Sequence, residues 1–136
     1  MRITNVSISR KFKTRKEVLE VVKRVEDELG ESLEDYVTEI TFMLTNKPYQ
    51  ACYITETRCI EVYANKAINE RTSLAHELIH AIQDKQGRIP QIQTGLLLVE
   101  YIYQDHEREA WILSTKLFGS KAEKAYVKEL YSLSEL

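Results

Sequence analysis

Two histidines and a glutamate lie at the spacing His76-Glu77-x-x-His80, within residues 73–82. If this stretch is helical, side chains four residues apart lie on the same face, one turn apart. Both imidazoles could then bind one metal ion from the same side. Glu77 would lie close enough to contact a water molecule on that metal without being a ligand itself. Of the 3 histidines in the chain, two lie in this one stretch.

The apolar residues around this motif also follow a helical pattern. At about 100° per residue, they fill one continuous arc, which consists of Leu74, Ala75, Leu78, Ile79, Ala81 and Ile82. The motif fills the other arc together with Ser73 and Asp84. One face of the helix can therefore pack on a core while the histidines face a cleft.

A catalytic zinc ion usually has three protein ligands and a water molecule, so a third ligand must come from elsewhere. The candidates cluster at residues 106–109, on a helix that we expect over 106–118. On that helix Glu107 and His106 point toward the inward, mostly small and apolar face, whereas Glu109 is the worst placed. We therefore favour Glu107, with His106 and Glu109 as alternatives. Glu109 could instead be a surface carboxylate or contact a zinc-bound imidazole.

These motifs carry a resemblance to a known family. His76-Glu77-x-x-His80, on a helix preceded by a small sheet, resembles the zincin metallopeptidases. The sequence Glu107-Arg108-Glu109-Ala110 is similar to the E-x-x-A signature of the gluzincins, which take their third ligand from a Glu. The short chain resembles the minigluzincins and the small proteases that cleave phage and radiation-response repressors. The resemblance covers about residues 35–118.

The resemblance implies a zinc-dependent endopeptidase that binds one Zn²⁺ per chain and acts on polypeptides. His76, His80 and Glu107 would be the ligands, and Glu77 the general base. It also implies an extended substrate that pairs with an edge strand, for which 49–55 is the better placed candidate.

The donor that would stabilise the oxyanion is left open by the sequence. Tyr101, Tyr103, His106 and Arg108 all lie in the right part of the chain.

Two other functions are compatible with the same residues. The chain could be a latent or degenerate zincin that acts as a metal-containing protein-binding module, with segment 121–136 shielding the metal. It could also be a non-enzymatic domain in which the motif is accidental. Two histidines and a carboxylate suit iron as well as zinc.

The pattern of expected helices and strands predicts an α+β fold, which must position the site. This fold has a small antiparallel-rich sheet, an N-terminal helix, the motif helix and C-terminal helices. A weak alternation predicts a short strand over 2–9. Thr14 and Gly30 bound a helix over 15–29, and Asn65 is expected to cap the motif helix, which ends near Gly87. The remaining expectations are an antiparallel meander of strands 36–44, 49–55 and 58–64, a loop over 88–95, and helices over 95–103, 106–118 and 121–133.

Composition narrows the class of protein. A chain of 136 residues with 43% hydrophobic and 29% charged residues is expected to form one domain, residues 1–136. A net charge of −2 gives no basic surface for nucleic acid. No apolar run is long enough to cross a membrane and no signal region begins the chain, so we expect a cytoplasmic protein. Cys52 and Cys59 are expected to lie diagonally across a hairpin, reduced and half-buried.

Overall fold

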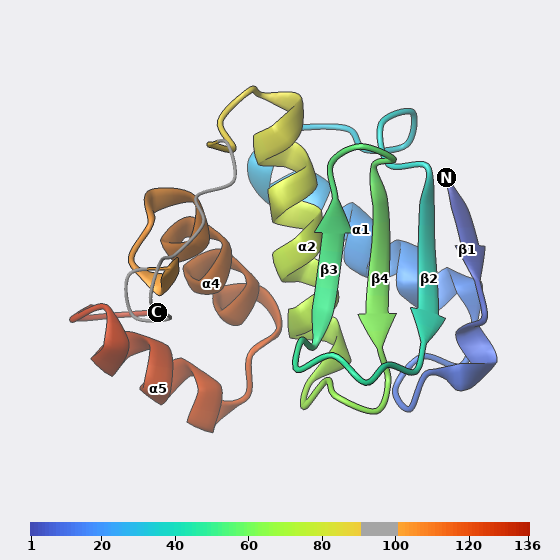
Figure 1. Ribbon diagram of the computed structural model, residues 1–136. Coiled ribbons are helices and arrows are strands. Elements are labelled where there is room, and N and C mark those ends of the chain that lie inside the picture. Colours follow the sequence, from blue (N-terminus) through green and yellow to red (C-terminus); the bar gives the residue numbers. More distant parts are fainter. Residues whose placement is uncertain (91–100) are drawn as a thin grey trace.

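The computed structural model describes residues 1–90 and 101–136. It shows a small α+β fold, in which a sheet lies beside a group of helices (Figure 1). In chain order the elements are β1 (Arg2–Thr4), the 3-10 helix η1 (Val6–Ile8), α1 (Arg15–Leu29), β2 (Glu39–Met43), β3 (Ala51–Ile54), β4 (Cys59–Tyr63), α2 (Glu70–Lys85), α4 (Asp105–Phe118) and α5 (Lys121–Leu130).

Within the described residues, the strands form one four-stranded sheet in the order β1-β2-β4-β3. β2 runs parallel to both β1 and β4, and only β3 is antiparallel to its neighbour. The predicted antiparallel meander is therefore wrong, and so is the description of the sheet as antiparallel-rich. The chain leaves β2, passes below the end of β4 and forms the edge strand β3 (Figure 1). A hairpin then leads into β4, which lies between β3 and β2.

Burial explains this strand order. Ile40 and Phe42 of β2, and Ile60 and Val62 of β4, are fully buried, so these strands occupy the centre of the sheet. β3 has only intermediate burial along its length, which suits an edge strand. The prediction that residues 49–55 form an edge strand is thus confirmed for the described sheet. Cys52 pairs with Glu61, which places Cys59 diagonally, and both cysteines are free and half-buried as expected.

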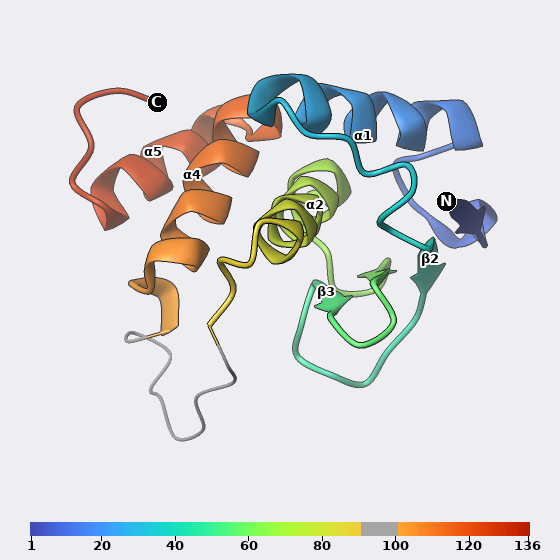
Figure 2. The same ribbon diagram turned by 90° about the horizontal axis from the view of Figure 1, so that it is seen from above.

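The helices are arranged in order outward from the sheet. α1 and α2 cover one face of the sheet, α4 packs against α2, and α5 packs on the far side of α4 (Figures 1 and 2). α1 has the predicted bounds, because Thr14 caps its first turn and Gly30 ends it in the left-handed conformation, with φ 67°. The core between these layers is apolar and includes Phe12, Val18, Val22, Val25, Leu33, Ile40, Phe42, Leu74, Leu78 and Ile82.

Other boundaries differ from the predictions. The strand expected over 2–9 is only β1, because Asn5 adopts a left-handed conformation with φ 59° and starts η1. Asn65 does not cap α2, since its side chain binds both backbone groups of Thr45, and Asn69 caps the helix instead. α2 ends at Lys85, close to the predicted end. Residues 95–100 of the helix expected over 95–103, and residues 91–95 of the loop expected over 88–95, lie outside the described residues, whereas Tyr101 and Ile102 are helical as expected.

The C-terminal helices lie close to their expected ranges. α4 begins at Asp105, one residue before the expected start, and Gln104 is its N-cap. α5 ends at Leu130, three residues before the expected end at residue 133. None of the helices in residues 1–90 and 101–136 is both long and apolar enough to span a membrane.

Candidate metal centre

The capping residue of α2 also fixes where α4 lies. The side-chain oxygen of Asn69 accepts hydrogen bonds from the backbone N–H groups of Arg71 and Thr72, at 3.1 and 3.3 Å. Its amide nitrogen donates to the carbonyl of Phe118 at 3.2 Å and to the carboxylate of Glu123 at 2.8 Å. The start of α2 is therefore held to the junction between α4 and α5. This contact helps to set the register of α4 along α2.

Two imidazoles and one carboxylate converge between these helices. Nε2 of His76 lies 3.0 Å from Nε2 of His80. Oε1 of Glu107 lies 2.9 Å from Nε2 of His76, and Oε2 lies 3.0 Å from Nε2 of His80. Relative exposures are 8% for His76, 7% for His80 and 2% for Glu107. The motif and the favoured third residue thus meet in one buried cluster.

This arrangement can hold a metal ion, because its potential ligand atoms all lie within 4.8 Å of one another. Tetrahedral ligands at a zinc–nitrogen distance of about 2 Å would lie about 3.3 Å apart, similar to the spacing seen here. Two neutral imidazoles that present Nε2 lone pairs at 3.0 Å would repel each other. A cation bound by both lone pairs removes that repulsion, and so does a proton on one Nε2 atom that is donated in a hydrogen bond to the other.

The electrostatics of the cluster also favour positive charge. Burial alone would lower the pKa of His80, but the hydrogen bond to Glu107 and the charges of Glu77 and Glu107 outweigh it and raise that pKa to about 9. Burial would conversely raise the pKa of Glu107, yet hydrogen bonds from both histidines hold it far below its usual value. A site that stabilises an imidazolium next to a carboxylate is one that also suits a cation.

Each imidazole has a different neighbour on its outer side. The ring of His76 packs against Trp111 of α4, with 4.4 Å between centroids, and its Nδ1 atom finds no hydrogen-bond partner within residues 1–90 and 101–136. Nδ1 of His80 lies 2.7 Å from Oε1 of Gln83, a side chain with 0% exposure. Neither Trp111 nor Gln83 was identified from the sequence. Trp111 follows Glu107 by four residues, so the helical spacing indicates that both side chains lie on the same face of α4.

Glu77 lies beside the cluster rather than in it. Its relative exposure is 7%, and its charge helps to raise the pKa of His80. Its charge also contributes to the raised pKa values of Cys52 on β3 and of Tyr101, although burial is the largest cause for both. The charge of Glu77 therefore reaches His80, Cys52 and Tyr101 alike.

The alternative third ligands have other partners. Glu109 forms a two-pronged ion pair with Arg88, at 3.1 and 3.0 Å, and accepts a hydrogen bond from Gln83. His106 lies near the cluster, with its Nε2 atom 3.7 Å from Oε2 of Glu107, but it does not belong to the three converging residues. Glu107, rather than Glu109 or His106, thus supplies the third converging ligand atom beside the motif histidines.

The candidate oxyanion donors separate into two groups. The hydroxyl of Tyr103 donates to the carbonyl of Leu130, and the guanidinium of Arg108 lies over the ring of Tyr131, so both residues face α5. The hydroxyl of Tyr101 has a pKa raised by burial and by its interaction with Glu107. Tyr101 and His106 are therefore the candidates that lie close to the cluster.

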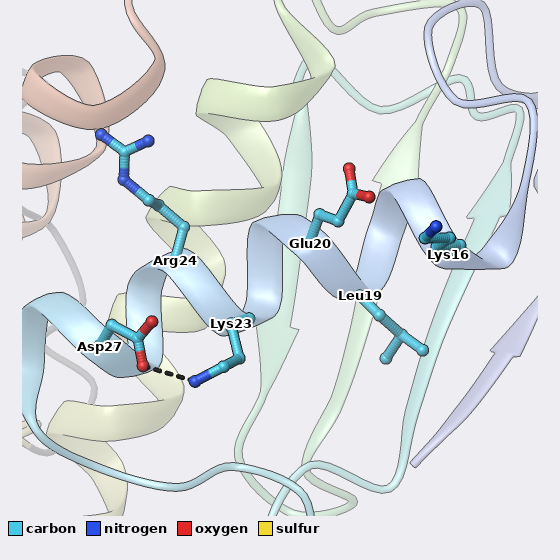
Figure 3. A pocket seen from close by; sticks show the side chains of 6 residues that line it. All are labelled: Lys16, Leu19, Glu20, Lys23, Arg24 and Asp27. Carbon is cyan, nitrogen blue, oxygen red and sulfur yellow. Dashed lines mark hydrogen bonds and ion pairs between the residues drawn. The ribbon is translucent and has the colours of Figure 1, made fainter.

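Two further features lie away from the cluster. α5 packs on α4 on the side away from α2, except where Glu123 meets Asn69 (Figure 2). Shielding of the metal by segment 121–136 stays a prediction. A shallow hollow lies on the exposed face of α1 and is lined by that helix alone (Figure 3). Lys23 and Asp27 pair there at 2.8 Å, as on an ordinary solvated helix.

Comparisons of this chain with protein-family models, curated proteins and solved structures give no match. The functional interpretation therefore depends on the residues of the cluster and their geometry.

Proposed function

We propose that this protein is a zinc-dependent metallopeptidase of the zincin type, similar to the minigluzincins. His76, His80 and Glu107 are the proposed ligands of one zinc ion, and Glu77 is the proposed general base. The observation that carries the proposal is the convergence of both Nε2 atoms of the motif with the carboxylate of a separate helix, at 2.9–3.0 Å in a buried site.

The proposed reaction is hydrolysis of a peptide bond. Zinc in this site would supply a Lewis acid that activates water and polarises the peptide carbonyl. The Glu77 carboxylate would accept a proton from the attacking water and pass it to the departing amine. Tyr101 or His106 could donate a hydrogen bond to the oxygen that becomes negatively charged.

The edge of the sheet supports a polypeptide substrate. β3 is an edge strand of the described sheet and packs against α2, which carries the motif. An extended peptide could add to that edge through backbone hydrogen bonds and so lie along α2. Such a peptide would pass near Glu77, whose charge is felt by Cys52 on the same strand.

The substitution Glu77→Gln tests this function. It removes the base but none of the three ligands, so we expect zinc content near one per chain and a loss of cleavage of at least about 100-fold. Zinc is measured by elemental analysis, and cleavage on a panel of unfolded proteins. The substitution Glu56→Gln, in the exposed β3–β4 turn, makes the same chemical change and should alter neither quantity.

One observation favours the second candidate, a latent zincin that serves as a metal-containing binding module. The motif side chains are only 7–8% exposed, which leaves little room for a substrate in this conformation. A wild-type chain that binds zinc stoichiometrically but cleaves no member of the panel would favour this module over the peptidase. A chain that takes up no metal after zinc is added back would contradict both.

A further inference from the structure

Gln83 connects one candidate ligand to the helix that carries another. It lies on α2, three residues after His80, and is completely buried. Its Oε1 atom lies 2.7 Å from Nδ1 of His80. Its Nε2 atom donates to the carbonyl of His106 at 2.9 Å and to the carboxylate of Glu109 at 3.1 Å.

These partners leave only one orientation for the amide. A carbonyl oxygen and a carboxylate accept hydrogen bonds and cannot donate them, so both must face the NH₂ group of Gln83. The amide oxygen must then face His80 and can only accept. Nδ1 of His80 must therefore carry a proton. A neutral His80 with its proton on Nδ1 has its lone pair on Nε2, the atom that faces His76 and Glu107.

A second ion pair fixes the orientation of Gln83 in turn. Arg88, just beyond the end of α2, binds both carboxylate oxygens of Glu109 at 3.1 and 3.0 Å. This two-pronged contact fixes the plane of the carboxylate that accepts from Gln83. The carbonyl of His106 belongs to the first turn of α4, next to Glu107. Gln83 therefore orients the imidazole of His80 and also holds the turn that carries Glu107.

The geometry points to Gln83 as a positioning residue of the metal centre, one that selects the metal-binding form of His80 and is itself oriented by Glu109 and Arg88. This inference rests on the proposed metal centre. It does not depend on peptidase activity, because it concerns only how tightly the site binds a cation. Outer-shell partners of metal-bound histidines typically contribute 10- to 100-fold to metal affinity.

The main test is the substitution Gln83→Met, which keeps an unbranched side chain of similar length but removes the amide. We expect zinc affinity, measured by competition with a chelator, to fall by about 10- to 100-fold. The matched control is Gln50→Met. The amide oxygen of Gln50 accepts from the backbone of Ile68 and from the hydroxyl of Ser73, near the start of α2 and away from Gln83, so its substitution should change the affinity by less than about 2-fold.

A second variant separates this role from simple packing. Gln83→Glu keeps an acceptor for His80 but places two carboxylates together, so it should also weaken zinc binding. Adding Glu109→Gln restores a donor between the two positions and should recover affinity to within a few-fold of wild type. In the zinc-loaded protein, the Nδ1 proton of His80 should be observable by NMR in the wild type and exchange faster with solvent in Gln83→Met.

The outcomes distinguish the two proposals. A wild-type chain that takes up no zinc would contradict the metal centre and hence the proposed function. Zinc binding that is equally tight in the wild type and in Gln83→Met would overturn the role of Gln83 alone. A double variant that binds no better than Gln83→Glu would also overturn it.

Discussion

The pH dependence of the metal-free protein should reveal the contact between His80 and Glu107. The folded state raises the pKa of His80 from 6.5 to about 9, which means that it binds this proton more tightly than the unfolded chain does. The resulting stabilisation is fully present below pH 6.5 and is lost as the pH rises through 9. At about 1.4 kcal/mol per pKa unit, the free energy of unfolding should fall by about 3 to 4 kcal/mol at most.

Other groups near the cluster act outside this range. The pKa of His106 is lowered, chiefly by burial, so its effect on stability appears below pH 6.5. The pKa of Glu107 is also lowered, so its contribution is present above the usual carboxylate pKa and is lost only in acid. Between pH 6.5 and 9, therefore, His80 is the group of the cluster whose proton should control stability.

The assay is urea unfolding of chelator-treated protein at several pH values and constant ionic strength. The substitution Glu107→Gln is the control, because an amide cannot hold the charged imidazole and the pH dependence should largely disappear. Saturating zinc should also abolish the decline, since a metal ion takes the place of the proton. A wild-type stability that is flat or rises between pH 6.5 and 9, with no metal present, would refute this reasoning.

Two further substitutions test how the site is positioned. Asp84→Ala removes the carboxylate that accepts hydrogen bonds from the hydroxyls of Tyr36 and Tyr53, at 3.0 and 2.6 Å. In a denaturant titration, the free energy of unfolding should fall by about 2 kcal/mol. An unchanged value would mean that water replaces the carboxylate without loss of stability. Asn69→Ala removes a helix cap together with the contacts to the α4–α5 junction, and should lower the free energy of unfolding by about 2 kcal/mol. Thr14→Ala removes a cap with one backbone contact, and should lower it by about 1 kcal/mol. Equal losses in these two variants would show that the tie to α4 contributes nothing.

Local signals in the sequence were sufficient for α1 but not for the start of α2. Thr14 and Gly30 act through neighbouring backbone groups, so both ends of α1 could be predicted from the pattern alone. The cap of α2 could not be predicted in this way, because Asn65 and Asn69 both precede the helix. What distinguishes them is distant in the chain: Asn69 binds the end of α4, whereas Asn65 binds Thr45 after β2.

The pairing of the strands required information that the local pattern does not contain. A short turn predicts the β3–β4 hairpin, and the hairpin is present. Whether β2 then pairs with β3 or with β4 depends on which strand has a fully buried inner face. Ile60 and Val62 on β4 are completely buried, while β3 is not, so the hairpin inserts with β4 inward and pairs in parallel with β2.

The candidate site was predictable to the extent that it depends on helix geometry. The i, i+4 spacing of His76 and His80 and the inward face of the later helix were sufficient to favour Glu107. Gln83 was missed because a glutamine gives no distinctive motif. Its position one turn after His80 on the same helix is the signal that could have indicated it, because an amide oxygen there can accept a hydrogen bond from Nδ1 of that histidine.

The contact between Trp111 and His76 gives the protein a natural optical probe. Trp111 is the single tryptophan of the chain, and its ring lies 4.4 Å from the imidazole of His76. Ultraviolet emission from indole therefore originates beside the cluster, with no background from other tryptophans. A paramagnetic ion such as Co²⁺ in that position would quench this emission at short range, so occupancy could be followed in real time without a label.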